Sequence, residues 1–278
     1  MTIAAGFAFD DGILFCVDTK VTTSIKTNEP KLVFYRHADG KCATAFAMSS
    51  DDLAFPRSAI ESCREAVDKI NFDDATIESV RKAIQSALAK FYREHIFPHP
   101  DRNTGAIYLE LLVGIWLHGE TRLFVSHETI LTPIDDYECV GSGAFLAKYL
   151  VRQYRSANPD PLALEDAALI GSFAVERVME HDEYSGGEAD MLILKNNGDV
   201  ESGHETAIYP GDDLVKAIQE STWNLLRALA HIKGDLEVES GELLERYFEK
   251  VRNLNAQSKW WFEKWAELNK SRTKPAND

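Results

Sequence analysis

The chain opens with MTIAAGFAFDDGILFCVDTKVTTSIKTNEPK, residues Met1–Lys31, and this stretch decides the fold. Two apolar runs flank Asp11-Gly12, a dipeptide that is typical of a hairpin turn. A threonine, Thr2, follows the first methionine, and Asp18 closes the second apolar run. A polar loop then leads to Lys31, which opens a third apolar run. The sequence therefore predicts a hairpin with Thr2 at one strand end and Asp18 at another.

Thr2 gives the first functional hypothesis, which is that Met1 is removed and Thr2 becomes an N-terminal nucleophile. An α-amino group has a pKa of about 8, so it is a natural general base near neutral pH. A threonine hydroxyl is a weak nucleophile until a base takes its proton, and its own amine can do so. The ammonium of Lys31 would lower the pKa of the hydroxyl, and Asp18 would orient that ammonium. Taken alone, a threonine at this position also fits an ordinary first strand.

Composition narrows the class of protein. The chain has 278 residues, 45% of them hydrophobic and 27% charged, as in ordinary globular proteins. A net charge of −15 argues against a nucleic-acid partner. The four cysteines are scattered without a Cys-x-x-Cys pair, which indicates reduced thiols and a cytoplasmic location. We expect no signal peptide, and the longest apolar run, Leu111–Leu117, is too short to span a membrane.

The order of elements predicts the architecture. A β-rich segment, two helices, a second β-rich segment, two helices and a third β-rich segment follow one another up to residue 208. This order favours antiparallel sheets with helices packed outside them, as two stacked sheets between two helix layers. The predicted strands are 2–9, 13–18, 31–36, 41–48, 106–117, 121–126, one ending at 138–143, 190–195 and 200–208. The predicted helices run from a cap at 49–52 to about residue 70, from 75 to 97, and over 144–156, 162–180, 212–232 and 236–272.

The last predicted helix carries a cluster of aromatic residues, namely Trp260, Trp261, Phe262 and Trp265. We interpret the cluster as a docking surface against the domain or a neighbouring subunit, with a ligand cage as the alternative.

Two further motifs join Thr2, Asp18 and Lys31. Gly141-Ser142-Gly143 stands at a predicted strand-to-helix junction, and residues 182–187, DEYSGG, stand between a helix and a strand. Either motif alone is an ordinary turn. Together, in this order and at these junctions, the positions resemble the proteasome β-subunit family of N-terminal threonine (Ntn) hydrolases, in particular its bacterial proteasome-related members.

The resemblance implies a role for each matching residue. Thr2 would be the nucleophile, Asp18 would orient Lys31, and Lys31 would tune the nucleophile electrostatically. A hydrogen-bonding network around the free α-amine would consist of Ser142, Asp182 and Ser185. The implied fold is α+β, a four-layer αββα sandwich over residues 1–208, and residues 209–278 would form a C-terminal helical extension that the family pattern does not predict.

The sequence departs from the family pattern near the predicted site. Ser49 falls where the family has a glycine whose backbone N–H serves the oxyanion hole, a role that any residue except proline can fill. The loop between Asp18 and Lys31 is a few residues short, and Lys20 and Val21 are expected in the wall of the substrate pocket. Only Met1 precedes Thr2, so we expect simple removal of the methionine rather than propeptide cleavage.

The resemblance implies a threonine-type endopeptidase that cleaves peptides or unfolded proteins inside a self-compartmentalising homo-oligomer. An ATP-dependent unfoldase is a further partner of the kind that the resemblance admits. Two alternatives stay open: a non-catalytic structural or interaction subunit that retains Met1, and an Ntn amidohydrolase acting on a small amide. We expect no cofactor and no metal, because Pro98 interrupts the spacing of His95 and His99 and no glycine-rich phosphate loop is present.

Overall fold

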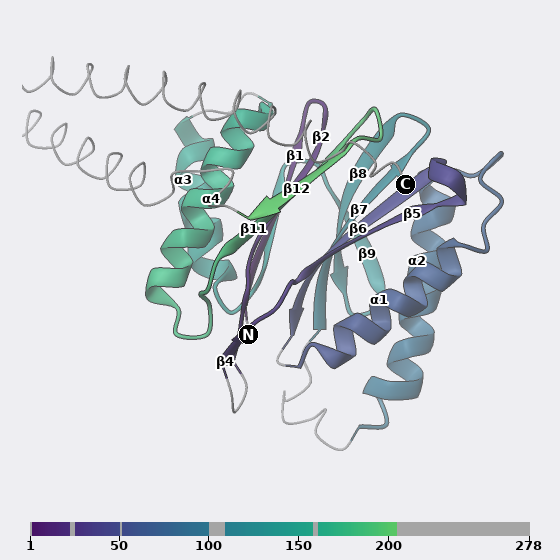
Figure 1. Cartoon of the computed structure of the whole chain (residues 1–278), viewed down its shortest axis with the longest axis horizontal. Helices are drawn as coiled ribbons and strands as arrows, with labels where there is room; N and C mark the ends of the chain where they lie inside the picture. Colours follow the sequence, from purple (N-terminus) through teal and green to yellow (C-terminus); the bar gives the residue numbers. More distant parts are fainter. Residues whose placement is uncertain (1, 23–25, 51, 100–108, 158–160, 205–278) are drawn as a thin grey trace, which may run out of the picture. The chain divides into compact units, whose positions relative to one another are not determined.

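The computed structural model describes residues 2–22, 26–50, 52–99, 109–157 and 161–204 (Figure 1). The chain divides into two units, residues 1–204 and 205–278, and every described residue belongs to the first. Met1, the predicted boundary at residue 208, the predicted helices 212–232 and 236–272 and the aromatic cluster at 260–265 lie outside the described residues. The domain division therefore stays a prediction.

The N-terminal hairpin lies inside a five-stranded antiparallel sheet. Strand β1 (Ile3–Phe9) pairs with β2 (Gly12–Asp18), as the Asp11-Gly12 turn predicts. The strand order is β10-β1-β2-β11-β12, where β10 is Tyr137–Gly141, β11 is Ala189–Lys195 and β12 is Val200–His204. Strands from both ends of the described chain therefore build one sheet.

A second five-stranded antiparallel sheet has the order β5-β6-β7-β8-β9. It uses the intervening part of the chain, and its strands follow one another in sequence. They are β5 (Leu32–His37), β6 (Cys42–Ser50), β7 (Leu109–Leu117), β8 (Glu120–His127) and β9 (Ile130–Ile134). A short 3-10 turn, Ala38–Gly40, joins β5 to β6.

Helices cover the outer face of each sheet, and the two sheets face each other (Figure 1). Helices α1 (Ala54–Val67) and α2 (Ile77–Phe91) pack on the second sheet, and α2 continues into a π-helical turn, Tyr92–Ile96. Helices α3 (Ala144–Ala157) and α4 (Leu164–His181) pack on the first. The described part of the chain is therefore an αββα sandwich, and the predicted fold class is confirmed.

The side chains of β6 contribute to two different apolar clusters, because successive side chains along a strand point to opposite faces. Along β6, the side chains of Ala43, Ala45 and Ala47 face the first sheet, and those of Phe46 and Met48 face α1 and α2. Small residues on the inner face allow the two sheets to approach each other closely. Strand β6 is thus buried on both faces, as its apolar sequence predicts.

Three local predictions are wrong or incomplete. The predicted cap at 49–52 is only partly present: Ser49 and Ser50 continue β6 by pairing with Glu110 and Leu109 of β7, whereas Asp52 Oδ1 accepts a hydrogen bond from the N–H of Ala54, the first residue of α1, at 2.8 Å. The N-cap of α1 is Leu53 instead, without a side-chain hydrogen bond. Strand β9 and the short hairpin β3 (Lys20–Thr22) and β4 (Lys26–Asn28) were not predicted. Within the described residues, every helix is too short or too polar to cross a membrane.

Candidate active site

The predicted site residues lie together at one end of the strands of the first sheet because of the strand register. Ile3 at the start of β1 pairs with Gly141 at the end of β10, and Asp18 at the end of β2 pairs with Ala189 of β11. The turn after β10 and the loop before β11 therefore meet next to Thr2. Lys31 reaches the same place from the second sheet, immediately before β5.

Thr2, Asp18 and Lys31 form one buried cluster in which each contacts the other two. The Thr2 hydroxyl donates a hydrogen bond to Asp18 Oδ1, and Lys31 Nζ donates to Thr2 Oγ1. Lys31 Nζ also lies 2.8 Å from Asp18 Oδ1. The three residues are exposed by 1%, 0% and 1% respectively, so solvent screens these contacts little.

Burial and charge act in opposite directions on Lys31. Burial disfavours the ammonium and lowers the pKa of Lys31 from its ordinary value, and the carboxylate of Asp18 offsets this only in part. The Lys31 ammonium also donates to the backbone carbonyl of Lys20 at 2.5 Å. The result is a lysine that loses its proton more easily than an exposed one, positioned on the Thr2 hydroxyl.

A second network consists of Ser142, Asp182 and Ser185. The hydroxyls of Ser142 and Ser185 donate to Asp182 Oδ2 at 2.6 and 2.7 Å, and the Tyr184 N–H donates to Asp182 Oδ1 at 3.1 Å. Partial burial raises the pKa of Asp182, but these hydrogen bonds outweigh it and hold the pKa below its usual value. Ser142 Oγ also lies 3.4 Å from the Thr2 carbonyl oxygen, which places this network beside Thr2.

Backbone groups that the sequence does not reveal connect the two networks. Asp18 accepts hydrogen bonds from the Ile3 N–H and the Gly186 N–H, both at 3.0 Å. Lys20 Nζ donates to the carbonyls of Glu183 and Ser185 at 2.8 and 3.1 Å, which ties β3 to the loop before β11. Backbone donors carry no residue-type signal, so the sequence offers no means of finding them.

Gly141 is required by close packing at the site. Its φ is +103°, and a Cβ there would lie 2.0 Å from the Thr2 carbonyl oxygen and 2.9 Å from Ser49 Oγ. Any other residue would therefore displace Thr2, Ser49 or both. The sequence singles out Gly141 as part of a turn motif, but the contact with Thr2 comes only from the structure.

The three residues predicted for the substrate pocket are placed differently. Ser49 lies beside Gly141 and Thr2, as the previous contacts show. The ammonium of Lys20 is bound to backbone carbonyls of the neighbouring loop. Val21 is 8% exposed and belongs to the apolar core with residues of α1 and α2, so most of its side chain packs inside the domain.

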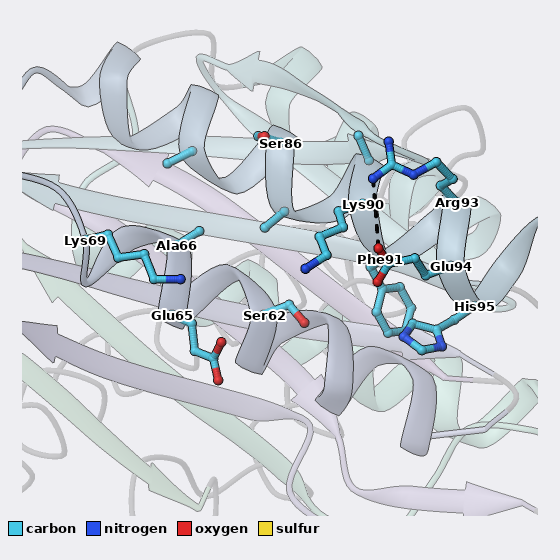
Figure 2. Close-up of a pocket in the computed structure, with 13 residues that line it drawn as sticks. Ser62, Glu65, Ala66, Lys69, Ser86, Lys90, Phe91, Arg93, Glu94 and His95 are labelled. Atoms are coloured by element: carbon cyan, nitrogen blue, oxygen red, sulfur yellow. Dashed lines mark ion pairs between the residues drawn. The ribbon is translucent and has the colours of Figure 1, made fainter.

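A separate open cavity of about 580 Å³ lies between α1 and α2 and contains none of the predicted site residues (Figure 2). Its lining carries charges of both signs, including Lys69, Lys90 and an Arg93–Glu94 ion pair at 3.9 Å. His95 also lines this cavity, where its ring lies 4.8 Å from that of Phe91. This cavity is therefore separate from the predicted site around Thr2.

Comparison of the sequence with known proteins finds similarity to proteasome β subunits. No protein-family model matches the chain. "Proteasome subunit beta 2" of Pyrobaculum neutrophilum is 26% identical over 200 residues, which cover 70% of this chain and 89% of the relative. The protein of the same description from Korarchaeum cryptofilum is 23% identical over 202 residues, 71% of this chain and 93% of the relative.

Similarity to solved structures extends over a larger part of this chain than similarity to these sequences. Anbu from Hyphomicrobium sp. strain MC1, as a Gly-1 mutant, aligns with a TM-score of 0.65 and 16% identity, covering 84% of this chain and 98% of that one. The fold of this chain is proteasome-like. Anbu from Yersinia bercovieri, described as an ancestral beta-subunit, gives a TM-score of 0.65 at 13% identity, with the same coverage of both chains.

At identities of 13–26% these relatives establish the architecture. The roles of Thr2, Asp18, Lys31, Ser142, Asp182 and Ser185 stay predictions, now with their mutual contacts described.

Proposed function

We propose that the chain is a threonine-type peptidase that uses Thr2 as its N-terminal nucleophile after removal of Met1. The observation that carries the proposal is the buried contact of the Thr2 hydroxyl with both Asp18 and Lys31. The Lys31 ammonium would favour the ionised form of that hydroxyl and Asp18 would orient the ammonium, while the α-amine of Thr2 would act as the base. The network of Ser142, Asp182 and Ser185 beside the Thr2 backbone adds support, because it supplies polar partners for a free α-amine.

The proposed reaction proceeds in two steps. In the first, the bond from Thr2 Oγ1 to the peptide carbonyl carbon forms while the hydroxyl proton moves to the α-amine. The tetrahedral intermediate collapses, the C–N bond breaks, and the amine returns the proton to the leaving nitrogen. In the second, water attacks the ester carbon and gives a proton to the amine; the bond from Thr2 Oγ1 to that carbon then breaks, the amine returns the proton to Oγ1, and the carboxylic acid product leaves.

We also propose that the chain assembles into a homo-oligomer that encloses the active sites. Its substrates would be peptides or unfolded proteins, and its location would be the cytoplasm. Similarity to proteasome subunits supports assembly into an oligomer. Enclosure would also keep a peptidase of low specificity apart from other proteins. An ATP-dependent unfoldase is proposed as a partner that would deliver such substrates.

The first experiment is the intact mass of the purified protein together with N-terminal sequencing. We expect a mass lower by one methionine and Thr2 as the first residue. Hydrolysis of fluorogenic peptides and of small amides is then compared between the natural protein and Thr2→Ala at equal assembly state by size-exclusion chromatography. Undiminished hydrolysis by Thr2→Ala would refute the mechanism. Retained Met1 would favour a non-catalytic subunit, and turnover of small amides alone would favour an amidohydrolase.

A further inference from the structure

Ser49 lies at the end of the row of β6 side chains that faces the first sheet. Alternation along the strand places it on the same face as Ala43, Ala45 and Ala47, which pack between the sheets. At this position its hydroxyl oxygen and the Thr2 carbonyl oxygen lie against the same side of Gly141. The side chain of Ser49 therefore points toward the backbone of the proposed nucleophile.

The Ser49 hydroxyl is buried and has no hydrogen-bond partner among the described residues. Buried polar groups in native proteins are almost always paired, and an unpaired one calls for an explanation such as a catalytic role. The next serine provides a contrast, because Ser50 Oγ accepts a hydrogen bond from the Asp52 N–H at 3.3 Å. Ser49 and Thr2 are 0% and 1% exposed, and the Ser49 hydroxyl and the Thr2 backbone carbonyl border the same buried position beside Gly141.

We propose that the Ser49 hydroxyl donates a hydrogen bond to the carbonyl oxygen of the peptide bond under attack. This inference rests on the proposed peptidase function. As the Thr2 Oγ1–carbon bond forms, the electron pair of the C=O bond moves to that oxygen, and the hydrogen bond from Ser49 strengthens as the negative charge grows. Ser49 keeps its own proton throughout. The family pattern has glycine here, so a side-chain donor is a property of this chain.

Two substitutions at Ser49 and one matched control test the proposal. Ser49→Ala removes the hydroxyl and keeps the Cβ, Ser49→Gly removes both, and Ser50→Ala changes the neighbouring serine on the opposite face of the strand. We expect both Ser49 variants to lose about 100- to 1,000-fold in kcat on a fluorogenic peptide that the natural protein cleaves, with little change in KM. Inhibition by a peptide aldehyde should weaken by a similar factor, because the hemiacetal presents the same oxygen.

The melting temperature of the variants distinguishes a catalytic role of the Ser49 hydroxyl from a structural one. Because the Ser49 hydroxyl is unpaired, the melting temperature of Ser49→Ala should equal or exceed that of the natural protein. Ser50→Ala should keep the natural kcat.

Several results would overturn the proposal. Natural activity in Ser49→Ala would remove the hydroxyl from catalysis, and faster hydrolysis by Ser49→Gly would show that the side chain crowds the site. A shift of the acidic limb of the pH–rate profile without a change in the plateau would place the hydroxyl on the α-amine instead. Failure of the peptidase proposal is a separate observation: the natural protein and Thr2→Ala would then both leave the peptide uncleaved, and both proposals would fall.

Discussion

The Asp18–Lys31 ion pair allows a quantitative prediction for the substitution Asp18→Asn. Lys31 and Asp18 are 1% and 0% exposed, so this variant leaves an ammonium in the protein interior without its carboxylate. The lysine can release its proton, at a cost measured from its ordinary pKa of 10.5. At pH 7 that cost is about 3.5 pH units at ~1.36 kcal/mol each, a ceiling of about 5 kcal/mol. We expect the free energy of unfolding to fall by about 3–5 kcal/mol, as for other broken buried pairs.

The same reasoning predicts how the loss depends on pH. In the variant, Lys31 is neutral when folded and charged when unfolded, so the unfolded state binds more protons. Stability of the variant therefore rises with pH in this range. At pH 9 the ceiling is only about 2 kcal/mol. Urea unfolding at pH 7 and pH 9, at one protein concentration, measures both values.

Two controls separate the buried pair from general effects. Asp73→Asn breaks an exposed pair with Lys41, whose side chains are 69% and 53% exposed, and should cost less than about 1 kcal/mol. The double variant Asp18→Asn, Lys31→Met should recover most of the loss, because it leaves no unpaired charge. A single-variant loss below about 1 kcal/mol, an equal loss at both pH values, or a double variant as unstable as the single one would refute this reasoning.

Three further predictions concern the same domain. Peptide hydrolysis should decline on the alkaline side below pH 10.5, because burial lowers the pKa of Lys31; a kcat/KM profile measures this, and a limb at or above 10.5 would contradict it. Gly141→Ala should lower the free energy of unfolding by more than about 2 kcal/mol in urea unfolding, whereas Gly40→Ala, where no atom lies within 4 Å of the added Cβ, should cost less. Burial raises the pKa of the Cys42, Cys63 and Cys139 thiols to about 12. Iodoacetamide at pH 8 should therefore leave these thiols unmodified in the folded protein, and rapid labelling seen by mass spectrometry would contradict this.

Elements with a strong local pattern could be predicted from the sequence. The Asp11-Gly12 turn fixes the β1–β2 hairpin, and the four-residue spacing of Val80, Ile84 and Leu88 fixes the buried face of α2. The described α2 begins with a capping box at Thr76, which agrees with the predicted start after residue 74. Local chemistry is sufficient in these places because neighbours in sequence supply the contacts.

Elsewhere tertiary pairing overrides the local signal. The run of polar residues from Ser49 indicates a helix cap, yet hydrogen bonding to β7 extends β6 as far as Ser50. The hairpin of β3 and β4 has three residues per strand and little apolar content, so periodicity gives no sign of it.

The same limit applies to the candidate site. Its side chains could be named from the order of motifs along the chain. The Gly186 N–H on Asp18 and the unpaired hydroxyl of Ser49 could not, because they depend on which segments become neighbours in space.

The strand order has a consequence for the order of events during synthesis. The second sheet and its two helices come from residues 32–134, so this half is complete early in translation. The first sheet needs β10 and β11 to flank the β1–β2 hairpin, and these strands emerge about 120 to 180 residues after it. Thr2, Asp18 and Lys31 leave the ribosome first, whereas the loop carrying Asp182 and Ser185 leaves among the last of the described residues. A chain that ends before β10 therefore lacks Ser142, Asp182 and Ser185, which are half of the proposed catalytic residues.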